Sequence, residues 1–195
     1  MESPKPKVVF IGDPNVGKNT LFQYIQKIGC EDKTSGIIGT THFTLYFNQG
    51  DQQFDVEFWN AASNSYFSAI IPTYLHNASY VFVIFDTSNR DSFNNLNKWF
   101  EYIQQYALST TKIFLIGNKT DKNNEISNED VQNFAKNRVH FDYTEVSASS
   151  GSNVQLLLET LKKSVFSNPE FKSNTVNIHD RKINNAQRAA SCRIN

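Results

Sequence analysis

The sequence predicts an α/β domain in which helices cover both faces of a mostly parallel sheet. Segments with strand and helix patterns alternate about five times along the 195 residues, as in folds of this class. Two strand segments, 80–85 and 112–116, are almost wholly apolar, which is typical of strands covered on both faces. A glycine-containing turn joins the first strand directly to the first helix. The length suits one domain with its own core.

The N-terminal half combines one parallel strand with a hairpin. Residues 7–11 (KVVFI) are an apolar run that ends at a glycine, which predicts a buried strand. Residues 18–28 carry apolar side chains at helical spacing, and the polar segment 29–40, with three glycines, predicts a loop. The β-rich runs 42–47 and 53–59 are separated by Asn-Gln-Gly-Asp. This turn predicts an antiparallel pair.

The C-terminal half alternates strands and helices and ends in a segment without periodicity. The expected elements are strands over 80–85, 112–116 and 141–146 and helices over 93–103, 127–138 and 152–166. From residue 168 the chain is rich in Asn and Ser and carries scattered Arg and Lys. We therefore expect an N-terminal extension over 1–6, one domain over 7–167 and a flexible tail over 168–195.

Composition narrows the class of protein and its environment. Nineteen basic residues balance nineteen acidic ones, so nothing electrostatic favours nucleic acid as the main partner. Two cysteines are too few for a disulfide framework or a zinc site. No apolar run approaches the roughly 20 residues that a membrane span needs. The sequence therefore predicts a soluble, cytoplasmic protein.

The segment 12–18 (GDPNVGK) has the spacing of a phosphate-binding loop. It lies between a predicted strand and a predicted helix, the context in which G-x-x-x-x-G-K is specific. Glycines let backbone N–H groups point at phosphate oxygens, the helix N-terminus adds a positive dipole end, and Lys18 neutralises the outer phosphates. The alternative, a turn that binds nothing, is disfavoured by the flanking elements and the lysine. The residues expected at the phosphates are Gly12, Asn15, Val16, Gly17, Lys18, Asn19 and Thr20.

One position of this loop departs from the pattern. The residue after the lysine is usually Ser or Thr, whose hydroxyl binds Mg²⁺, and here it is Asn19. An amide oxygen can bind Mg²⁺, but the longer side chain must fit an octahedron with distances of about 2.1 Å. Thr20 is no simple substitute, because the next helical residue points about 100° away. Asn19 is therefore a metal-ligand candidate that fits the ion poorly.

A second segment, 118–121 (NKTD), follows a buried strand and has the residues needed to select guanine. Asp121 can accept hydrogen bonds from the ring N–H and the exocyclic amine of guanine, a donor pair that adenine lacks. The stem of Lys119 can cover one face of the base. After another predicted strand, a backbone N–H of segment 147–149 can reach the guanine carbonyl oxygen. The residues expected at the base are Asn118, Lys119, Asp121, Ser147, Ala148 and Ser149.

With these motifs, the chain resembles the Ras superfamily of small GTPases, and the Rab branch most closely. The resemblance covers about residues 7–166. Segment 58–70 (FWNAASNSYFSAI) stands where Rab proteins carry a WDTAG-type motif, and 86–100 (DTSNRDSFNNLNKWF) is similar to their strand-four and helix-three region. Residues 147–149 occupy the place of the SAK loop. The resemblance implies a Ras-like G domain of the P-loop NTPase class, with a six-stranded sheet, bound GTP or GDP, and two switch loops that respond to the γ-phosphate.

The resemblance also implies catalytic and magnesium-binding positions, and several are changed here. Lys18 matches the family lysine, whereas the glutamine that orients the attacking water aligns with the shorter Asn64. The switch-one threonine aligns with Ile37, although Thr40 or Thr41 can take its place after a shift of register. The D-x-x-G aspartate, which holds the metal through water, aligns with Asn60. These changes predict a weakly held Mg²⁺.

Three interpretations of these changes are open. In the first, the protein binds guanine nucleotide but hydrolyses GTP poorly, since misplacing a reacting group by about 1 Å can cost on the order of 100-fold in rate. In the second, it is a working GTPase whose metal and water are placed by substitute groups such as Thr40, Thr41 or Asn64. In the third, the domain no longer binds nucleotide.

The resemblance implies further partners and a place in the cell. Switch segments 30–47 and 58–76 would contact effector and exchange-type proteins, in vesicle traffic on the cytosolic face of endomembranes. Cys192 stands four residues from the terminus, the position of a prenylated cysteine. Arg193 and the final Asn195 depart from the usual ending, so a tail cysteine without lipid is the alternative. One lipid with few basic residues gives only reversible membrane contact.

Overall fold

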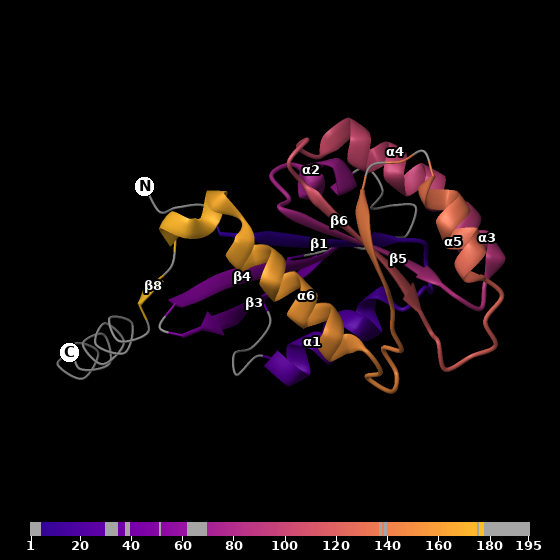
Figure 1. Ribbon diagram of the computed structural model, residues 1–195, viewed down its shortest axis with the longest axis horizontal. Helices are drawn as coiled ribbons and strands as arrows, with labels where there is room; N and C mark the ends of the chain where they lie inside the picture. The colour runs from indigo at the N-terminus through magenta and orange to yellow at the C-terminus, as the bar shows by residue number, and fades with distance from the viewer. Residues whose placement is uncertain are drawn as a thin grey trace.

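The protein is built on one twisted sheet with helices on both faces (Figure 1). The computed structural model describes residues 5–29, 35–37, 40–50, 52–61, 70–136, 138, 140–174 and 176–177. The strand order is β2-β3-β4-β1-β5-β6-β7, and β8 pairs with β4. The six longer strands are β1 (Lys7–Gly12), β3 (Thr40–Gln49), β4 (Gln52–Ala61), β5 (Tyr80–Asp86), β6 (Lys112–Asn118) and β7 (Phe141–Glu145).

These six strands confirm the predicted fold class. The pairs β1–β4, β1–β5, β5–β6 and β6–β7 are parallel, and β3–β4 is the antiparallel hairpin that the sequence predicts. Two short strands extend the sheet. Strand β2 (Ser35–Ile37) pairs with β3, within a segment predicted as loop, and β8 (Val176–Asn177) pairs with β4.

Three helices lie close to their predicted positions, one predicted helix is divided in two, and a short helix over residues 71–75 was not predicted. They are α1 (Lys18–Gly29), α2 (Ile71–Leu75), α3 (Arg90–Asn94), α4 (Leu96–Tyr106), α5 (Asn128–Ala135) and α6 (Val154–Ser167). The predicted helix 93–103 is two helices that meet at Asn95. The first begins earlier than expected because the side chain of Asn89 caps it, accepting from the N–H groups of Asp91 and Ser92.

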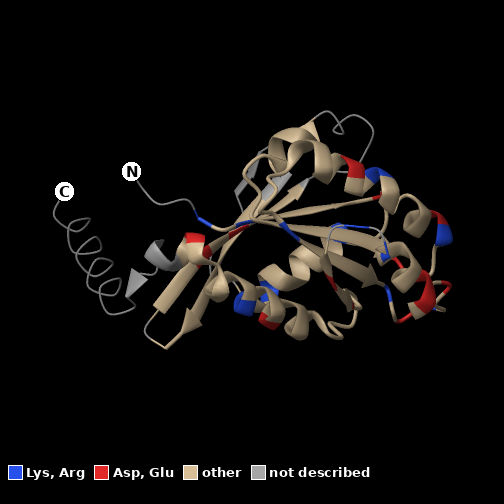
Figure 2. Ribbon diagram, turned by 45° about the horizontal axis from the view of Figure 1, so that its top comes forward, with Lys and Arg blue, Asp and Glu red and all other residues tan. Residues whose placement is uncertain are grey.

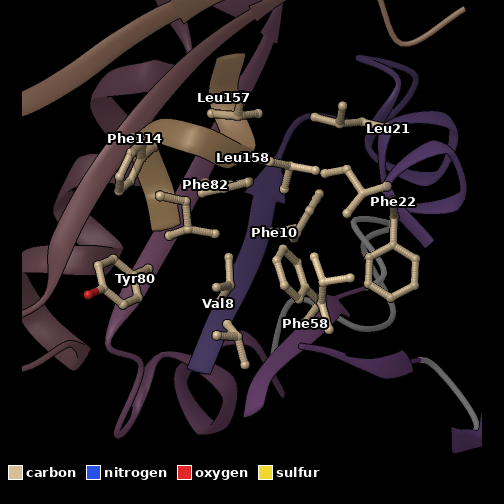
Figure 3. Packing of buried hydrophobic residues seen from close by; sticks show 14 of the residues in the cluster. Val8, Phe10, Leu21, Phe22, Phe58, Tyr80, Phe82, Phe114, Leu157 and Leu158 are labelled. Carbon is tan, nitrogen blue, oxygen red and sulfur yellow. The ribbon is translucent and has the colours of Figure 1, made fainter. Parts of the chain in front are cut away.

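Each face of the sheet carries its own hydrophobic core. Successive residues of a strand point to opposite faces, so Val8 and Phe10 pack under α1 and α6, whereas Val9 and Ile11 pack under α2 to α5. Figure 3 shows the first of these cores, in which the Phe10 and Phe82 rings lie 5.1 Å apart between their centroids. Burial on both faces explains why the central strands are almost wholly apolar.

The ordered fold continues beyond residue 167, where the predicted tail begins. A 3₁₀ helix spans Pro169–Asn174, and Phe171 is buried against the α1–α6 core. Strand β8 then pairs with Gln52 and Gln53 at the start of β4. The remaining tail, with Cys192, lies outside the described residues, as do residues 1–4. In the part of the chain that the structure describes, no helix is both long and apolar enough to cross a membrane.

Charged residues of both signs are mixed along the helices, as Figure 2 shows. This distribution agrees with the balance of nineteen basic and nineteen acidic residues.

The segments predicted to bind nucleotide share a place in the topology. Because β1, β5, β6 and β7 are parallel, their carboxyl ends meet at one edge of the sheet, where α/β folds bind their ligands.

Candidate nucleotide-binding site

The loop between β1 and α1 is shaped by three residues with positive φ angles. Gly12 has φ 142°, Asn15 has φ 63° and Gly17 has φ 93°. Gly12 lies directly against the backbone of β5, and a Cβ built there would stand 2.2 Å from the carbonyl oxygen of Ile84. The loop thus joins β1 directly to α1, which begins at its last residue, Lys18.

The side chain of Lys18 folds back into the loop. It is 4% exposed, and its Nζ donates to the carbonyl oxygens of Gly12 at 3.0 Å and Asp13 at 2.5 Å. Burial lowers the pKa of Lys18 to about 8, against the opposing effect of the Asp13 carboxylate. A buried, partly titrating cation is therefore held at the helix N-terminus, where an anion would bind.

The lowered pKa of Lys18 predicts a pH dependence of nucleotide binding. A bound phosphate favours the charged amine, so binding near pH 8 should take up a fraction of a proton, and affinity should fall by up to about tenfold per pH unit above 8. For the unliganded protein, the stability against unfolding should instead increase as the pH rises. The folded state loses this proton near pH 8 and the unfolded state near pH 10.5, so the free energy of unfolding should rise between these values. Calorimetry in two buffers of different ionisation enthalpy measures the proton uptake, and none at pH 8 would contradict the prediction.

Three residues that the sequence analysis did not assign to the site fix the phosphate loop, Asp13 within it and Asn95 and Trp99 outside it. The carboxylate of Asp13 accepts from Trp99 Nε1 at 2.8 Å through Oδ1 and from Asn95 Nδ2 at 2.7 Å through Oδ2. Trp99 is buried. The indole N–H of Trp99 and the amide of Asn95, in the turn between α3 and α4, therefore fix Asp13. The backbone carbonyl oxygen of Asp13 in turn accepts from Lys18.

At the base end, Asn118 connects two loops. It is 1% exposed; its Nδ2 donates to the carbonyl oxygen of Val16 at 2.9 Å, and its Oδ1 accepts from the Ala148 N–H at 3.0 Å. Asn118 thus links the phosphate loop to the loop that follows β7. In this arrangement the N–H of Ala148 has Asn118 Oδ1 as its acceptor.

Lys119 is held by its ammonium group, which contacts the phosphate loop and the end of β5. Its backbone is left-handed, with φ 69°. Nζ donates to the carbonyl oxygen of Asn15 at 2.6 Å and pairs with Asp86 Oδ2 at 2.6 Å. Burial of Asp86 opposes ionisation, but its bonds from Lys119 and Ser88 keep its pKa below the ordinary value. Asp86, at the end of β5, is a further site residue that the sequence analysis did not assign.

Asp121 lies beside the loop after β7. Its Oδ1 accepts from Ser147 Oγ at 2.6 Å, and Ser147 Oγ lies 3.0 Å from Ser149 Oγ. The hydrogen bond from Ser147 is the main reason why the pKa of Asp121 is lowered. The predicted base-selecting residues from two separate loops are therefore brought together, with an ionised carboxylate oriented by a serine.

At the predicted metal-binding positions, the side-chain amides of Asn19 and Asn60 face each other. Asn60 Nδ2 donates to Asn19 Oδ1 at 2.8 Å. Thr20 is exposed on α1. Strand pairing sets Thr41 opposite Asn60 and Thr40 opposite Ile37, while Asn64 lies outside the described residues. Within the described ranges, no group of three or more His, Cys, Asp or Glu residues could hold a metal ion.

A glycine-bearing loop with a buried lysine, set between a central strand and a helix at the carboxyl edge of a parallel sheet, defines a nucleotide-binding domain of the P-loop class. The segment that begins at Asn118 is tied to this loop, because Asn118 Nδ2 donates to the carbonyl oxygen of Val16.

Comparison with known proteins identifies the family. The model of the Ras family matches residues 7–167, so the chain belongs to the Ras family, in its Rab-like branch, as the resemblance predicted. It is 30% identical over 190 residues to the GTP-binding protein YPT53 of Saccharomyces cerevisiae, covering 93% of this chain and 86% of that protein. It is 27% identical over 178 residues to the GTP-binding protein ypt3 of Schizosaccharomyces pombe, covering 89% and 83%.

Proposed function

We propose that this protein binds GTP and GDP as a Rab-like switch or scaffold in vesicle traffic or signalling, and that it hydrolyses GTP poorly. The observation that carries the proposal is the contact of Asn118 with both Val16 and Ala148, which joins the phosphate loop to the loop beside Asp121. Two yeast relatives of similar length are GTP-binding proteins. An ionised carboxylate beside a phosphate loop suits guanine, because guanine presents two donors to it.

The Asn19–Asn60 pair supports impaired hydrolysis. Phosphoryl transfer depends on a metal ion that neutralises charge between the β- and γ-oxygens and on a residue that orients the attacking water. Asn19 Oδ1 is occupied by Asn60, and the water-orienting position is Asn64. We therefore propose that Lys18 still binds the phosphates, while Mg²⁺ is held weakly and Asn64 places the water poorly.

Single-turnover cleavage of GTP in excess Mg²⁺ tests this proposal. Intrinsic Ras hydrolysis is on the order of 10⁻⁴ s⁻¹, and we expect a rate here at least about 100-fold lower, since both metal and water are misplaced. Tight binding of GTP must be measured in the same sample. Cleavage at the Ras rate that a chelator abolishes would overturn the impaired-hydrolysis proposal and leave nucleotide binding intact.

A working GTPase is the second candidate, and one observation favours it. The register of the β3–β4 hairpin sets Thr41 opposite Asn60, so a threonine stands next to a predicted metal-binding position. If a substitute threonine or Asn64 assists catalysis, Thr40→Ala, Thr41→Ala or Asn64→Ala slows cleavage at unchanged nucleotide affinity. Equal rates in all three variants and the unchanged protein would exclude this candidate.

The proposed partners follow from the family. Effector and exchange-type proteins would contact the switch segments 30–47 and 58–76, of which the structure describes only parts. We propose a cytoplasmic protein that acts at the cytosolic face of endomembranes, with Cys192 as the candidate site of lipid attachment. Mass spectrometry of the C-terminal peptide from a eukaryotic host tests the lipid, and an unmodified cysteine would leave protein contacts as the means of recruitment.

A further inference from the structure

We propose that the Asn19–Asn60 amide pair replaces Mg²⁺ in holding the phosphates, so that this protein retains guanine nucleotide without a divalent ion. The inference rests on the proposed nucleotide binding and adds to it how the polyphosphate is held. It assigns Asn19 a direct role, in which its side-chain N–H groups donate to phosphate oxygen.

The pair is fixed from the β-sheet side. Asn60 is 7% exposed, and in β4 it stands between Phe10 of β1 and Thr41 of β3. Its Nδ2 donates to Asn19 Oδ1 at 2.8 Å. Asn19 itself is exposed and directly follows Lys18 at the start of α1. The buried amide therefore sets the orientation of the exposed one.

This orientation presents donors to the phosphate side. A carboxamide has one oxygen and one NH₂ group, and the oxygen of Asn19 already accepts from Asn60. The NH₂ group of Asn19 points away from that bond and has no acceptor among the described residues. Phosphate oxygens require donors, and hydrogen bonds to charged acceptors are stronger than those between neutral groups.

The donor set does not fit Mg²⁺. The ion prefers carboxylate and other free oxygen ligands in octahedral geometry. The carboxylate of Asp13, within the phosphate loop, is already paired with Trp99 and Asn95, and that of Asp86 is paired with Lys119. The Asn60 amide, which aligns with a family aspartate, carries no charge. The phosphates are then balanced by Lys18, the helix N-terminus and the amide donors.

A second amide arrangement makes the opposite prediction. In the structure, Asn60 Oδ1 is buried and has no hydrogen-bond partner among the described residues. If both amides turned over, this oxygen would accept from Asn19, and Asn19 Oδ1 would face the phosphates, as a cation requires. Bound phosphate favours the first arrangement and bound Mg²⁺ the second, so the response of nucleotide release to Mg²⁺ distinguishes them.

The test measures the release of a fluorescent GDP analogue from the full chain, in excess Mg²⁺ and in excess EDTA. Coupling between two ligands is typically 5- to 150-fold where it exists, and we expect the two release rates to differ by less than about fivefold. Release that EDTA accelerates by more than about fivefold would overturn the inference while leaving the proposed nucleotide binding in place. A protein that binds no GDP in either buffer would overturn both.

Variants separate direct donation from a structural effect. Asn19→Ala should accelerate release about 10- to 100-fold in EDTA, the value of hydrogen bonds to a charged acceptor. Asn19→Ser combined with Asn60→Asp restores a hydroxyl and a carboxylate and should make release strongly sensitive to EDTA. Gln105→Ala, which removes an exposed carboxamide from α4, is the matched control and should change neither rate.

A direct probe completes the test. On addition of GDP in EDTA, the side-chain NH₂ resonances of Asn19, assigned by their loss in Asn19→Ala, should shift downfield in a ¹⁵N–¹H spectrum. Side-chain resonances that stay in place while GDP binds would overturn the inference.

Discussion

Replacing Asp121 with alanine is expected to lower the affinity for GDP by about 100- to 1,000-fold. The carboxylate can accept two hydrogen bonds from guanine, and both are charge-assisted. The structure orients this group, since Ser147 Oγ donates to Asp121 Oδ1 at 2.6 Å. Titration of the unchanged protein and the variant with GDP, in parallel with ADP, measures the effect.

Two comparisons make the Asp121 result specific. The affinity for ADP, which lacks the donor pair, should change little, so the preference for guanine collapses with the carboxylate. Ser147→Ala removes the serine that orients Asp121 but keeps the carboxylate, and its expected loss is about tenfold. An equal loss for GDP and ADP in Asp121→Ala would show that the residue supports the fold of the site rather than selecting the base.

The second large effect is expected from Gly12→Ala, which should lower the free energy of unfolding by about 3 kcal/mol or more. A Cβ at this position would stand 2.2 Å from the Ile84 carbonyl oxygen. That atom belongs to the backbone of β5, which pairs with β1 at this residue, so it cannot rotate away as a side chain would. Urea unfolding followed by circular dichroism measures the loss.

Gly50→Ala is the matched control for this prediction. Gly50 also has a positive φ, of 57°, but a Cβ there would meet no atom within 4 Å. Its replacement carries only the cost of a left-handed backbone, about 1 kcal/mol. The difference between the two variants isolates the contact with β5. Equal destabilisation would mean that β1 and β5 separate easily, contrary to the packing described here.

Much of the fold can be predicted from the sequence because local pattern and burial agree. The apolar run 80–85 becomes β5, buried along its whole length, and the Asn-Gln-Gly-Asp sequence correctly predicts the antiparallel β3–β4 pair. The break between α3 and α4 is missed because apolar spacing runs continuously through it. A capping asparagine at residue 89 was the signal for the earlier helix start.

The site is predictable only where a motif is contiguous. Residues 12–20 and 118–121 can be recognised because each loop carries its chemistry within a few positions. The contacts of Asp13 with Asn95 and Trp99 join residues 82 and 86 positions apart, and Asn19 meets Asn60 across 41 positions. The identity of those partners is decided by strand order and helix placement, which residue types alone do not specify.

The position of Asn118 has a consequence for fragments of the ligand. One side chain touches both the phosphate loop and the loop beside the base, so ordering either loop lowers the entropic cost of ordering the other. Guanosine and pyrophosphate, added as separate molecules, should therefore help each other to bind. The intact nucleotide would benefit from this mutual reinforcement in addition to the advantage of a covalent link.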